Sequence, residues 1–408
     1  MKEWETIQLY YACKLVAGYA FKSKDFGDYP DKVIKITHIV PPTVDMKNLT
    51  GVDLSQYERK KLIKYIAKQG DYVLAMTGAT IGKMGRIEES EAYVNQRVLL
   101  FKNNPNVDKD YLFYVLQQNK FQQYILNHID SESAQPNISA ATVGKYEFLL
   151  PSLKIQNKIG KFLRLIDDKI NVNNRINDNL EQQISEIYKA WYQDFSCAVN
   201  VPMVASEYGI IPQGWHYSML SDLCKSISVT HKFDSDKLIF LNTGDIKDGR
   251  FLHENYMIVS EMPGQAKKSI ALGDILFSEI RPTNRHFAYV NFPAKDYVVS
   301  TKLMVIRTTS LDSRRLYHFL TSEDVLMELQ MQAESRSGTF PQIRFDNVSK
   351  LPILIADDKT EAAFTDLLHT VYTQIEHNNL ENGKLRTLRD NLLPRLMSGE
   401  LDVSELDI

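Results

Sequence analysis

The sequence predicts an α+β protein made of two similar globular domains, each followed by a long helix. Three observations support this class: an internal repeat with an offset of about 205 residues, strand and turn signals in the first part of each copy, and heptad periodicity in the second part. Solenoid repeats have units of only a few tens of residues. The offset here is therefore the size of a domain with an attached helix.

Matching residues at equivalent points define the two copies: Asn173-Asn174 and Asn378-Asn379, Ile170 and Ile375, Leu180 and Leu385, Pro136-Asn137-Ile138 and Pro341-Gln342-Ile343, Gly70-Asp71 and Gly273-Asp274, and Trp4 and Trp215. Two similar domains in one chain can present two separately tunable surfaces to one elongated partner. We predict four segments: domain 1 over 1–151, a central long helix over 152–200, domain 2 over 201–355, and a C-terminal long helix with a tail over 356–408.

Within the domains, runs rich in β-branched and aromatic residues between Gly, Asn, Asp and Pro predict short strands. The predicted strands are Lys32–Ile39, Tyr72–Thr77, Val94–Phe101 and Lys145–Leu150 in the first domain, and Leu238–Asn242, Asp274–Glu279, Val298–Arg307 and Leu351–Ile355 in the second. One helix is predicted in each domain, around Tyr111–His128 and Arg314–Met331.

Each long helix contains seam positions in alternating steps of 4 and 3, over 159–191 and 364–396. Such sustained, mostly apolar periodicity predicts a coiled-coil seam. Two asparagines interrupt each seam at matching positions: Asn173 and Asn177, and Asn378 and Asn382. A buried Asn costs stability but fixes the register; the alternative is a polar spot on a frayed face. If a pseudo-two-fold axis relates the copies, the helices run antiparallel and the asparagine pairs meet, which is the geometry we predict.

Composition narrows the class of protein. The chain has 408 residues, a hydrophobic fraction of 44%, a charged fraction of 24% and a net charge of −3. It has no apolar run long enough for a membrane span, and the N-terminal segment lacks the apolar core of a signal peptide. Three scattered cysteines are too few for a disulfide framework or a zinc site. We expect a cytoplasmic protein that could bind DNA only through local basic patches.

Several sequences imitate catalytic motifs but lack a required feature. Residues 78–84 resemble a P-loop, but the spacing is one residue short and Met84 follows the lysine, where the motif needs Ser or Thr. Asp274, Glu279 and Arg281 resemble a nuclease site without its lysine, and Met76 stands opposite Glu279 in the first copy. No glycine-rich turn for a methyl donor and no paired histidines for zinc are recognisable. We therefore expect no catalytic residue, metal site or cofactor in this chain.

Polar loops recur at equivalent points in both copies. Arg and Lys can read guanine and Asn and Gln adenine, while Ser and Thr serve phosphates or either base. One polar loop alone is more often merely solvated, but recurrence favours recognition. The candidate DNA-binding residues are Thr77, Thr80, Lys83, Arg86, Gln96, Arg97, Gln135 and Asn137 in the first domain, and Arg281, Thr283, Asn284, Arg285, Lys302, Arg336, Ser337, Thr339, Gln342 and Arg344 in the second.

Several motifs follow one another in a specific order along the chain. They are Gly70-Asp71 with the strand and Thr80-Ile81-Gly82 after it, the turn Gln135-Pro136-Asn137-Ile138, Leu150-Pro151, Trp191-Tyr192-Gln193-Asp194-Phe195, the stretch 209–215, and the stretch 393–401. In this order they make the chain resemble the DNA-specificity subunits of type I restriction–modification systems over essentially its whole length. Two departures are Ala356 opposite Pro151, and Arg281-Pro282-Thr283 in place of the Thr-Ile-Gly loop.

The resemblance implies two target recognition domains joined by two antiparallel helices, with each domain reading one half of a bipartite, asymmetric target in double-stranded DNA. It also implies that the helices set the spacer and dock two modification subunits, which carry S-adenosylmethionine and methylate adenine. Restriction subunits, which use ATP and Mg, would complete the assembly. The chain itself would then be a non-catalytic recognition subunit.

Other classes stay open on the sequence. One is a coiled-coil protein-interaction scaffold without DNA binding, and another is an orphan specificity protein with altered partners. A self-contained nuclease or methyltransferase is a third, against which the missing motifs argue.

Overall fold

The computed structural model describes residues 4–129, 136–336 and 341–403. The chain forms two compact units: unit 1 contains the residues up to Asn174 and those from Asn379 onward, and unit 2 is Arg175–Asn378. Each unit holds one globular head and one half of each long helix, α6 (Leu153–Tyr192) and α11 (Asp358–Met397). We call residues 5–150 head 1 and residues 203–355 head 2. No described helix is both long and apolar enough to cross a membrane.

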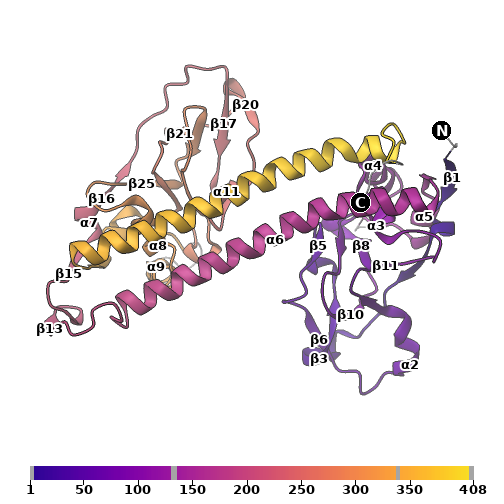
Figure 1. The fold of residues 1–408 in the computed structure, drawn as a ribbon, viewed down its shortest axis with the longest axis horizontal. Coiled ribbons are helices and arrows are strands. Elements are labelled where there is room, and N and C mark those ends of the chain that lie inside the picture. Colours follow the sequence, from indigo (N-terminus) through magenta and orange to yellow (C-terminus); the bar gives the residue numbers. More distant parts are fainter. Residues whose placement is uncertain (1–3, 130–135, 337–340, 404–408) are drawn as a thin grey trace. The chain divides into compact units, whose positions relative to one another are not determined.

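Head 1 contains two main sheets (Figure 1). Across the first lie β2 (Cys13–Ala17), β11 (Val98–Asn103), β8 (Tyr72–Ala75), β9 (Met84–Arg86), β5 (Thr43–Val44) and β4 (Ile39–Val40). Across the second lie β6 (Thr50–Val52), β3 (Phe26–Ile34), β10 (Glu91–Val94) and β7 (Ile66–Lys68). A further pair joins β1 (Glu5–Gln8) to β12 (Glu147–Leu150) just before α6 begins.

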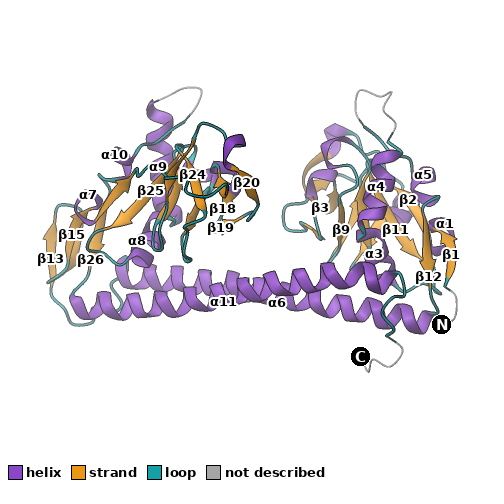
Figure 2. Ribbon diagram, turned by 90° about the horizontal axis from the view of Figure 1, so that it is seen from above, coloured by secondary structure: helices purple, strands orange, loops and turns teal. Residues whose placement is uncertain are grey.

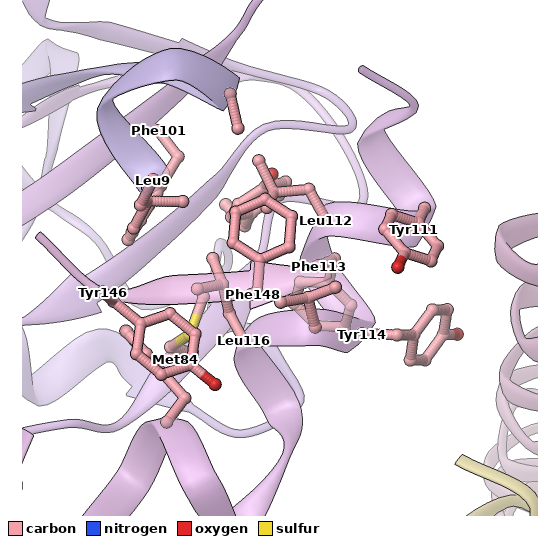
Figure 3. Close-up of a cluster of buried hydrophobic side chains, with 14 of the residues drawn as sticks. Leu9, Met84, Phe101, Tyr111, Leu112, Phe113, Tyr114, Leu116, Tyr146 and Phe148 are labelled. Carbon is pink, nitrogen blue, oxygen red and sulfur yellow. The ribbon is translucent and has the colours of Figure 1, made fainter. Parts of the chain in front are cut away.

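Short helices complete head 1: α1 (Leu9–Ala12), α2 (Arg59–Leu62), α3 (Lys109–Gln117), α4 (Asn119–Asn127) and α5 (Ala140–Gly144). Alternate side chains of β8 serve two cores. Tyr72 and Leu74 pack with residues of α3 and α4, whereas Val73 and Ala75 pack with residues of the second sheet. Figure 3 shows part of the first core, which α1, β9, β11, α3 and β12 build together. The sequence of β8 is a continuous apolar run because both faces of this strand are buried.

Head 2 repeats the order of the first four strands of the first sheet and of all four strands of the second (Figure 2). Its first sheet contains β16 (Cys224–Ile227), β25 (Leu303–Thr308), β22 (Ile275–Ser278) and β23 (Phe287–Tyr289), and its second contains β20 (Tyr256–Ile258), β17 (Lys237–Leu241), β24 (Tyr297–Ser300) and β21 (Ala266–Ser269). The paired strands are β15 (His216–Met219) with β26 (Pro352–Ile355), β18 (Ile246–Lys247) with β19 (Arg250–Phe251), and β13 (Met203–Ser206) with β14 (Gly209–Pro212). The helices are α7 (Leu220–Leu223), α8 (Ser313–Leu320), α9 (Glu323–Arg336) and α10 (Phe345–Val348). The predicted α+β class with a repeated domain is confirmed.

Some predicted elements are split in both heads. The apolar run 94–101 is not one strand, because a turn in which Val98 N donates to Asn95 O at 2.9 Å separates β10 from β11. The two strands belong to different sheets, and the run 298–307 is likewise divided into β24 and β25. The single helices predicted over 111–128 and 314–331 are each two helices; Gln118, extended at ψ 145°, separates α3 from α4.

The repeated Gly-Asp motif closes the turn before β8 and before β22. Both glycines have positive φ, 81° and 88°, a conformation that costs little without a Cβ. The buried carboxylate of Asp71 pairs with Lys102, and that of Asp274 accepts two hydrogen bonds from Arg307 at 2.6 and 2.8 Å. Burial alone would raise the pKa of Asp71, but hydrogen bonds from Lys102 and the backbone hold it below its usual value. The motif thus fixes the strand that leads to the polar loops.

In unit 1, the first half of α6 packs antiparallel against the second half of α11. Asn173 Nδ2 donates to Asn382 Oδ1 at 2.9 Å, and Arg389 Nη1 donates to Asp167 Oδ1 at 2.7 Å. Residue numbers therefore rise along one helix where they fall along the other. Both asparagines are 1% exposed.

Unit 2 has the same arrangement in the other helix halves. Asn378 Nδ2 donates to Asn177 Oδ1 at 2.7 Å, and both residues are buried. Farther along the helices, Ile184 of α6 shares a core with Phe364 and Leu368 of α11. The predicted antiparallel pairing with meeting asparagines is confirmed within each unit, and burial excludes a frayed polar face at these four positions.

Head 1 is fixed to α6 through α3. Tyr114 Oη donates to Asp167 Oδ2 at 2.6 Å, and Asp108 N donates to Gln156 Oε1 at 2.9 Å. Gly160 lets the start of α3 approach the helix closely: a Cβ there would lie 2.4 Å from Asp108 Oδ1 and 2.7 Å from Tyr111 N. The contact therefore depends on the missing side chain.

Head 2 is fixed to the helices by different chemistry. Arg315 of α8 is fully buried; its Nη2 donates to Leu354 O at 3.1 Å, its Nε lies 3.4 Å from Glu361 Oε2, and its guanidinium lies 4.2 Å from the Tyr192 ring centre. Burial lowers the pKa of nearby His318 to about 3, so this imidazole is neutral at pH 7. A fully buried cation is central to this attachment, whereas the contacts of α3 in head 1 are with a carboxylate and an amide of α6.

The replacement of proline by Ala356 also has a structural reason. In head 1, Pro151 has no N–H, and its carbonyl accepts from Gln156 Nε2 at 2.8 Å. In head 2, Ala356 N donates to Glu361 Oε1 at 3.0 Å. Pro151 therefore goes with Gln156, and Ala356 goes with Glu361. Proline has no N–H, whereas the N–H of alanine needs an acceptor, which the Glu361 carboxylate supplies.

We predict that Gly160→Ala destabilises the protein by about 1–3 kcal/mol, the usual range for overpacking a tight contact. The added methyl would meet backbone and a capping carboxylate that cannot both move aside. Thermal unfolding of the full chain measures the change. Gly383→Ala is the matched control: it lies in α11 with nothing within 4 Å of its Cβ position, so it should stabilise by about 0.5–1 kcal/mol. Equal stabilisation by both variants would contradict the close contact.

Candidate nucleic-acid interface

Three polar loops of head 1 meet at Met76, the residue after β8. Met76 N donates to Arg97 O at 2.9 Å, and Ile138 N donates to Met76 O at 3.0 Å. Gly78 N donates to Pro136 O at 3.0 Å. The loop after β8, the turn between β10 and β11, and the segment before α5 are thus joined by main-chain hydrogen bonds alone. We call this arrangement the loop junction.

Head 2 contains the same loop junction at Glu279. Glu279 N donates to Lys302 O at 3.1 Å, Ile343 N donates to Glu279 O at 2.9 Å, and Arg281 N donates to Pro341 O at 3.2 Å. Each bond has its counterpart in head 1. Because backbone groups make these bonds, the side chains of the loops can differ between heads without loss of the junction.

The turn that follows the junction has left-handed residues at equivalent positions in both heads, although the residues themselves differ. In head 1 the left-handed positions are Gly78 and Gly82, with φ of 70° and 81°. In head 2 they are Arg281 and Arg285, with φ of 43° and 58°. A residue with a Cβ is strained there by about 1–2 kcal/mol. Strained residues are often found at functional sites. Here both strained residues are arginines, so the polar turn carries two cations.

In head 1, most of the predicted DNA-binding residues lie on the loops of the junction or on the turn that follows it. Lys83, Gln96, Arg97 and Asn137 are exposed. Thr77 and Thr80 are partly buried, and Thr80 Oγ1 donates to Thr77 O at 3.3 Å, so these residues shape the turn.

Arg86 does not belong to the surface, contrary to our prediction. Its side chain is 4% exposed, and its Nη1 lies 2.7 Å from Asp110 Oδ1. The guanidinium lies 4.1 Å from the Phe113 ring centre. Arg86 therefore joins β9 to α3 inside the head.

In head 2, Arg281, Thr283, Asn284, Lys302, Gln342 and Arg344 are exposed. Thr283 Oγ1 donates to Gln330 Oε1 at 3.1 Å, which links the turn to α9. Arg285 is more restrained: its Nε donates to Asp248, and the guanidinium lies 5.3 Å from the Phe287 ring centre. Gln135, Ser337 and Thr339 lie outside the described residues, as does the side chain of Arg336.

The sequence alone did not identify the two residues at the centre of the junctions as part of the site. Met76 is 8% exposed in head 1, whereas the side chain of Glu279 in head 2 is 22% exposed and 4.0 Å from Lys302 Nζ. An acidic side chain can accept a hydrogen bond from cytosine N4. The comparison of the two copies already showed Met76 opposite Glu279, but nothing in the sequence indicated that this position joins the three loops.

Burial raises the pKa of Cys13 and of Cys224 to about 12, so neither is a thiolate at neutral pH. Within the part of the chain that the structure describes, no three His, Cys, Asp or Glu side chains gather as possible metal ligands.

The family of this chain follows from a comparison with known proteins. A family model described as the type I restriction modification DNA specificity domain matches residues 1–182 and 212–385. The chain belongs to this family. Each matched stretch contains all or most of one head and part of a long helix, so the predicted family and its DNA-specificity role are confirmed.

Relatives of the specificity family agree with this assignment. The Type I restriction enzyme HindI specificity subunit of Haemophilus influenzae is 40% identical over 181 residues, which are 44% of this chain and 39% of that protein. The MjaIX specificity subunit of Methanocaldococcus jannaschii is 24% identical over 344 residues, 82% of this chain and 78% of that protein. The crystal structure of the S subunit from M. genitalium has a TM-score of 0.56 at 12% identity, covering 98% of this chain and 97% of the other, and supports the fold.

We predict that Arg281→Gly raises the stability of the protein by about 1 kcal/mol, because it relieves a left-handed Cβ. Thermal unfolding measures the shift. Arg344→Gly is the matched control: it removes the same exposed side chain where φ is −126°, so no strain is relieved and stability should not rise. If Arg281→Gly gave no gain over this control, the strain would be refuted.

Proposed function

We propose that this chain is the non-catalytic reading subunit of a type I restriction–modification complex, in which each head reads one half of a bipartite, asymmetric target in double-stranded DNA. The observation that carries the proposal is the loop junction, which recurs bond for bond in both heads while the exposed side chains differ. A shared main-chain scaffold with different readers suits a target whose halves have different sequences.

The side chains suit base edges in the major groove. Head 1 presents Gln96, Arg97 and Asn137, which can recognise adenine and guanine. Head 2 presents Arg281, Lys302 and Gln342, with Glu279 between them. Other exposed cations would contact phosphates, which position a protein on DNA without specifying sequence.

The long helices would set the spacer and hold the partners. A 40-residue helix is about 60 Å long at 1.5 Å per residue, whereas one turn of DNA is about 34–36 Å. The buried asparagine pairs fix the register of these helices, and register determines any distance that the helices measure. Two modification subunits would dock there and supply S-adenosylmethionine chemistry at adenine, and restriction subunits would supply ATP-driven steps, in the cytoplasm.

A second candidate is a coiled-coil scaffold whose heads bind protein. It predicts no DNA affinity and no dependence on salt. The strained arginines of head 2 favour DNA, because a cationic turn held at a cost in stability suits a polyanion. An orphan specificity protein with altered partners would keep the reading heads and differ only in assembly.

Methylome sequencing tests the proposal. A host expressing this chain with its modification subunit should acquire a split adenine-methylated motif with two unlike halves. Arg281→Gly should weaken or relax recognition of one half only, by about 1–3 kcal/mol if it contacts a guanine, while the other half is unchanged. Absence of any new motif, with both subunits expressed and folded, would count against a reading function.

A further inference from the structure

A basic turn lies in head 1 outside the three loops. Helix α2 and the 3₁₀ turn after it, η3 (Ile63–Tyr65), contain four cations within six residues: Arg59, Lys60, Lys61 and Lys64. We call these four residues the basic turn. All four side chains are exposed.

An apolar side chain anchors the basic turn to the core of head 1. Leu62, at the end of α2, is 1% exposed and packs in a core with Phe21, Val33 and Tyr93. Because Leu62 points inward, the neighbouring cations are directed to solvent. Figure 1 shows α2 at the end of head 1 that is remote from α6, so the basic turn is not part of the helix surface.

Nearby acids neutralise only half of the charge. Arg59 Nη2 lies 2.9 Å from Asp31 Oδ2, and Lys61 Nζ lies 2.8 Å from Glu58 Oε1. Among the described residues, no acid forms an ion pair with Lys60 or Lys64; Lys64 Nζ lies 4.9 Å from the Tyr65 ring centre. Two exposed cations therefore remain available to an anionic partner.

Packed aromatic rings connect the basic turn to a reading loop. The ring centres of Tyr65 and Tyr19 are 5.3 Å apart. Tyr19 forms a β-bridge with Asn95, the first residue of the turn between β10 and β11 that carries Gln96 and Arg97. Packed rings and a backbone bridge thus connect the basic turn to the loop that carries Gln96 and Arg97.

Head 2 has no equivalent charge. The segment between β6 and β7 contains the basic turn, whereas residues 259–265, between β20 and β21, contain one Glu and neither Lys nor Arg. Since the strand order is shared, the difference is an addition to one head on a common scaffold.

We propose that the basic turn binds the phosphate backbone of the DNA duplex next to the half-site of head 1, independently of sequence. Lys60 and Lys64 would each neutralise one phosphate and release condensed counterions, which supplies affinity without base recognition. This inference rests on the proposed function. It assigns to head 1 a source of affinity that head 2 lacks.

The test compares salt dependence. The full chain and the variant Lys60→Gln/Lys64→Gln are titrated with a duplex containing the methylated motif and with a scrambled duplex of the same length. Each lost phosphate contact reduces the slope of log affinity against log salt by about 0.9, so the variant's slope should be shallower by about 2. Its affinity for both duplexes at low salt should fall by the same factor.

Lys154→Gln/Lys161→Gln, which removes two exposed lysines from α6, is the matched control and should leave the slope unchanged. An unchanged slope in the Lys60/Lys64 variant, a loss confined to the motif duplex, or an equal loss in the control would overturn the phosphate contact while leaving the reading function intact. No DNA binding by the unaltered chain would overturn the proposed function itself.

Discussion

Three main-chain hydrogen bonds around Met76, and three around Glu279, hold the loops on which each head's surface depends. Backbone groups are the same in every residue except proline, so this support is indifferent to side chains. The loops can therefore diverge while their backbone shape persists. The buried Gly-Asp turn fixes the strand that enters the junction, and the helix α4 or α9 packs beside the turn that leaves it. Backbone atoms thus hold the loops together, and the loop side chains can differ between the heads without loss of these bonds.

The heads are attached to the helices mainly through side chains, whereas the loop junctions are held by backbone groups. Head 1 uses Tyr114, Asp167 and the close approach at Gly160. Head 2 uses a fully buried Arg315 with Glu361 and aromatic rings. A buried cation is costly unless it is paired, so the changes from Gln156 to Glu361 and from Pro151 to Ala356 belong together. The asparagine pairs, by contrast, are the same in both copies. Each buried amide hydrogen-bonds an amide of the facing helix, so neither partner can change alone.

Sequence reasoning predicted the features that depend on periodicity: the repeat, the seam and the positions of Asn173 and Asn382. It did not separate β10 from β11, because strands buried on both faces give one continuous apolar run. It placed Arg86 on the surface, because its partner Asp110 follows more than twenty residues later and only folding brings them together. The strain at Arg281 was also invisible, although aligning that residue with Gly78 would have indicated a left-handed position. Base preference and partner surfaces depend on atoms outside the chain.

The central claim is that the junction is a common scaffold and the side chains on it are the readers. Replacing residues 78–82 of head 1 by 281–285 of head 2, residues 95–97 by 300–302, and Asn137 by Gln would keep every junction bond while exchanging readers. Methylome sequencing of a host with this variant and the modification subunit measures the outcome directly. The half of the motif read by head 1 should change toward the half read by head 2, and the other half should stay the same. A variant that folds and still methylates the original motif would contradict the account.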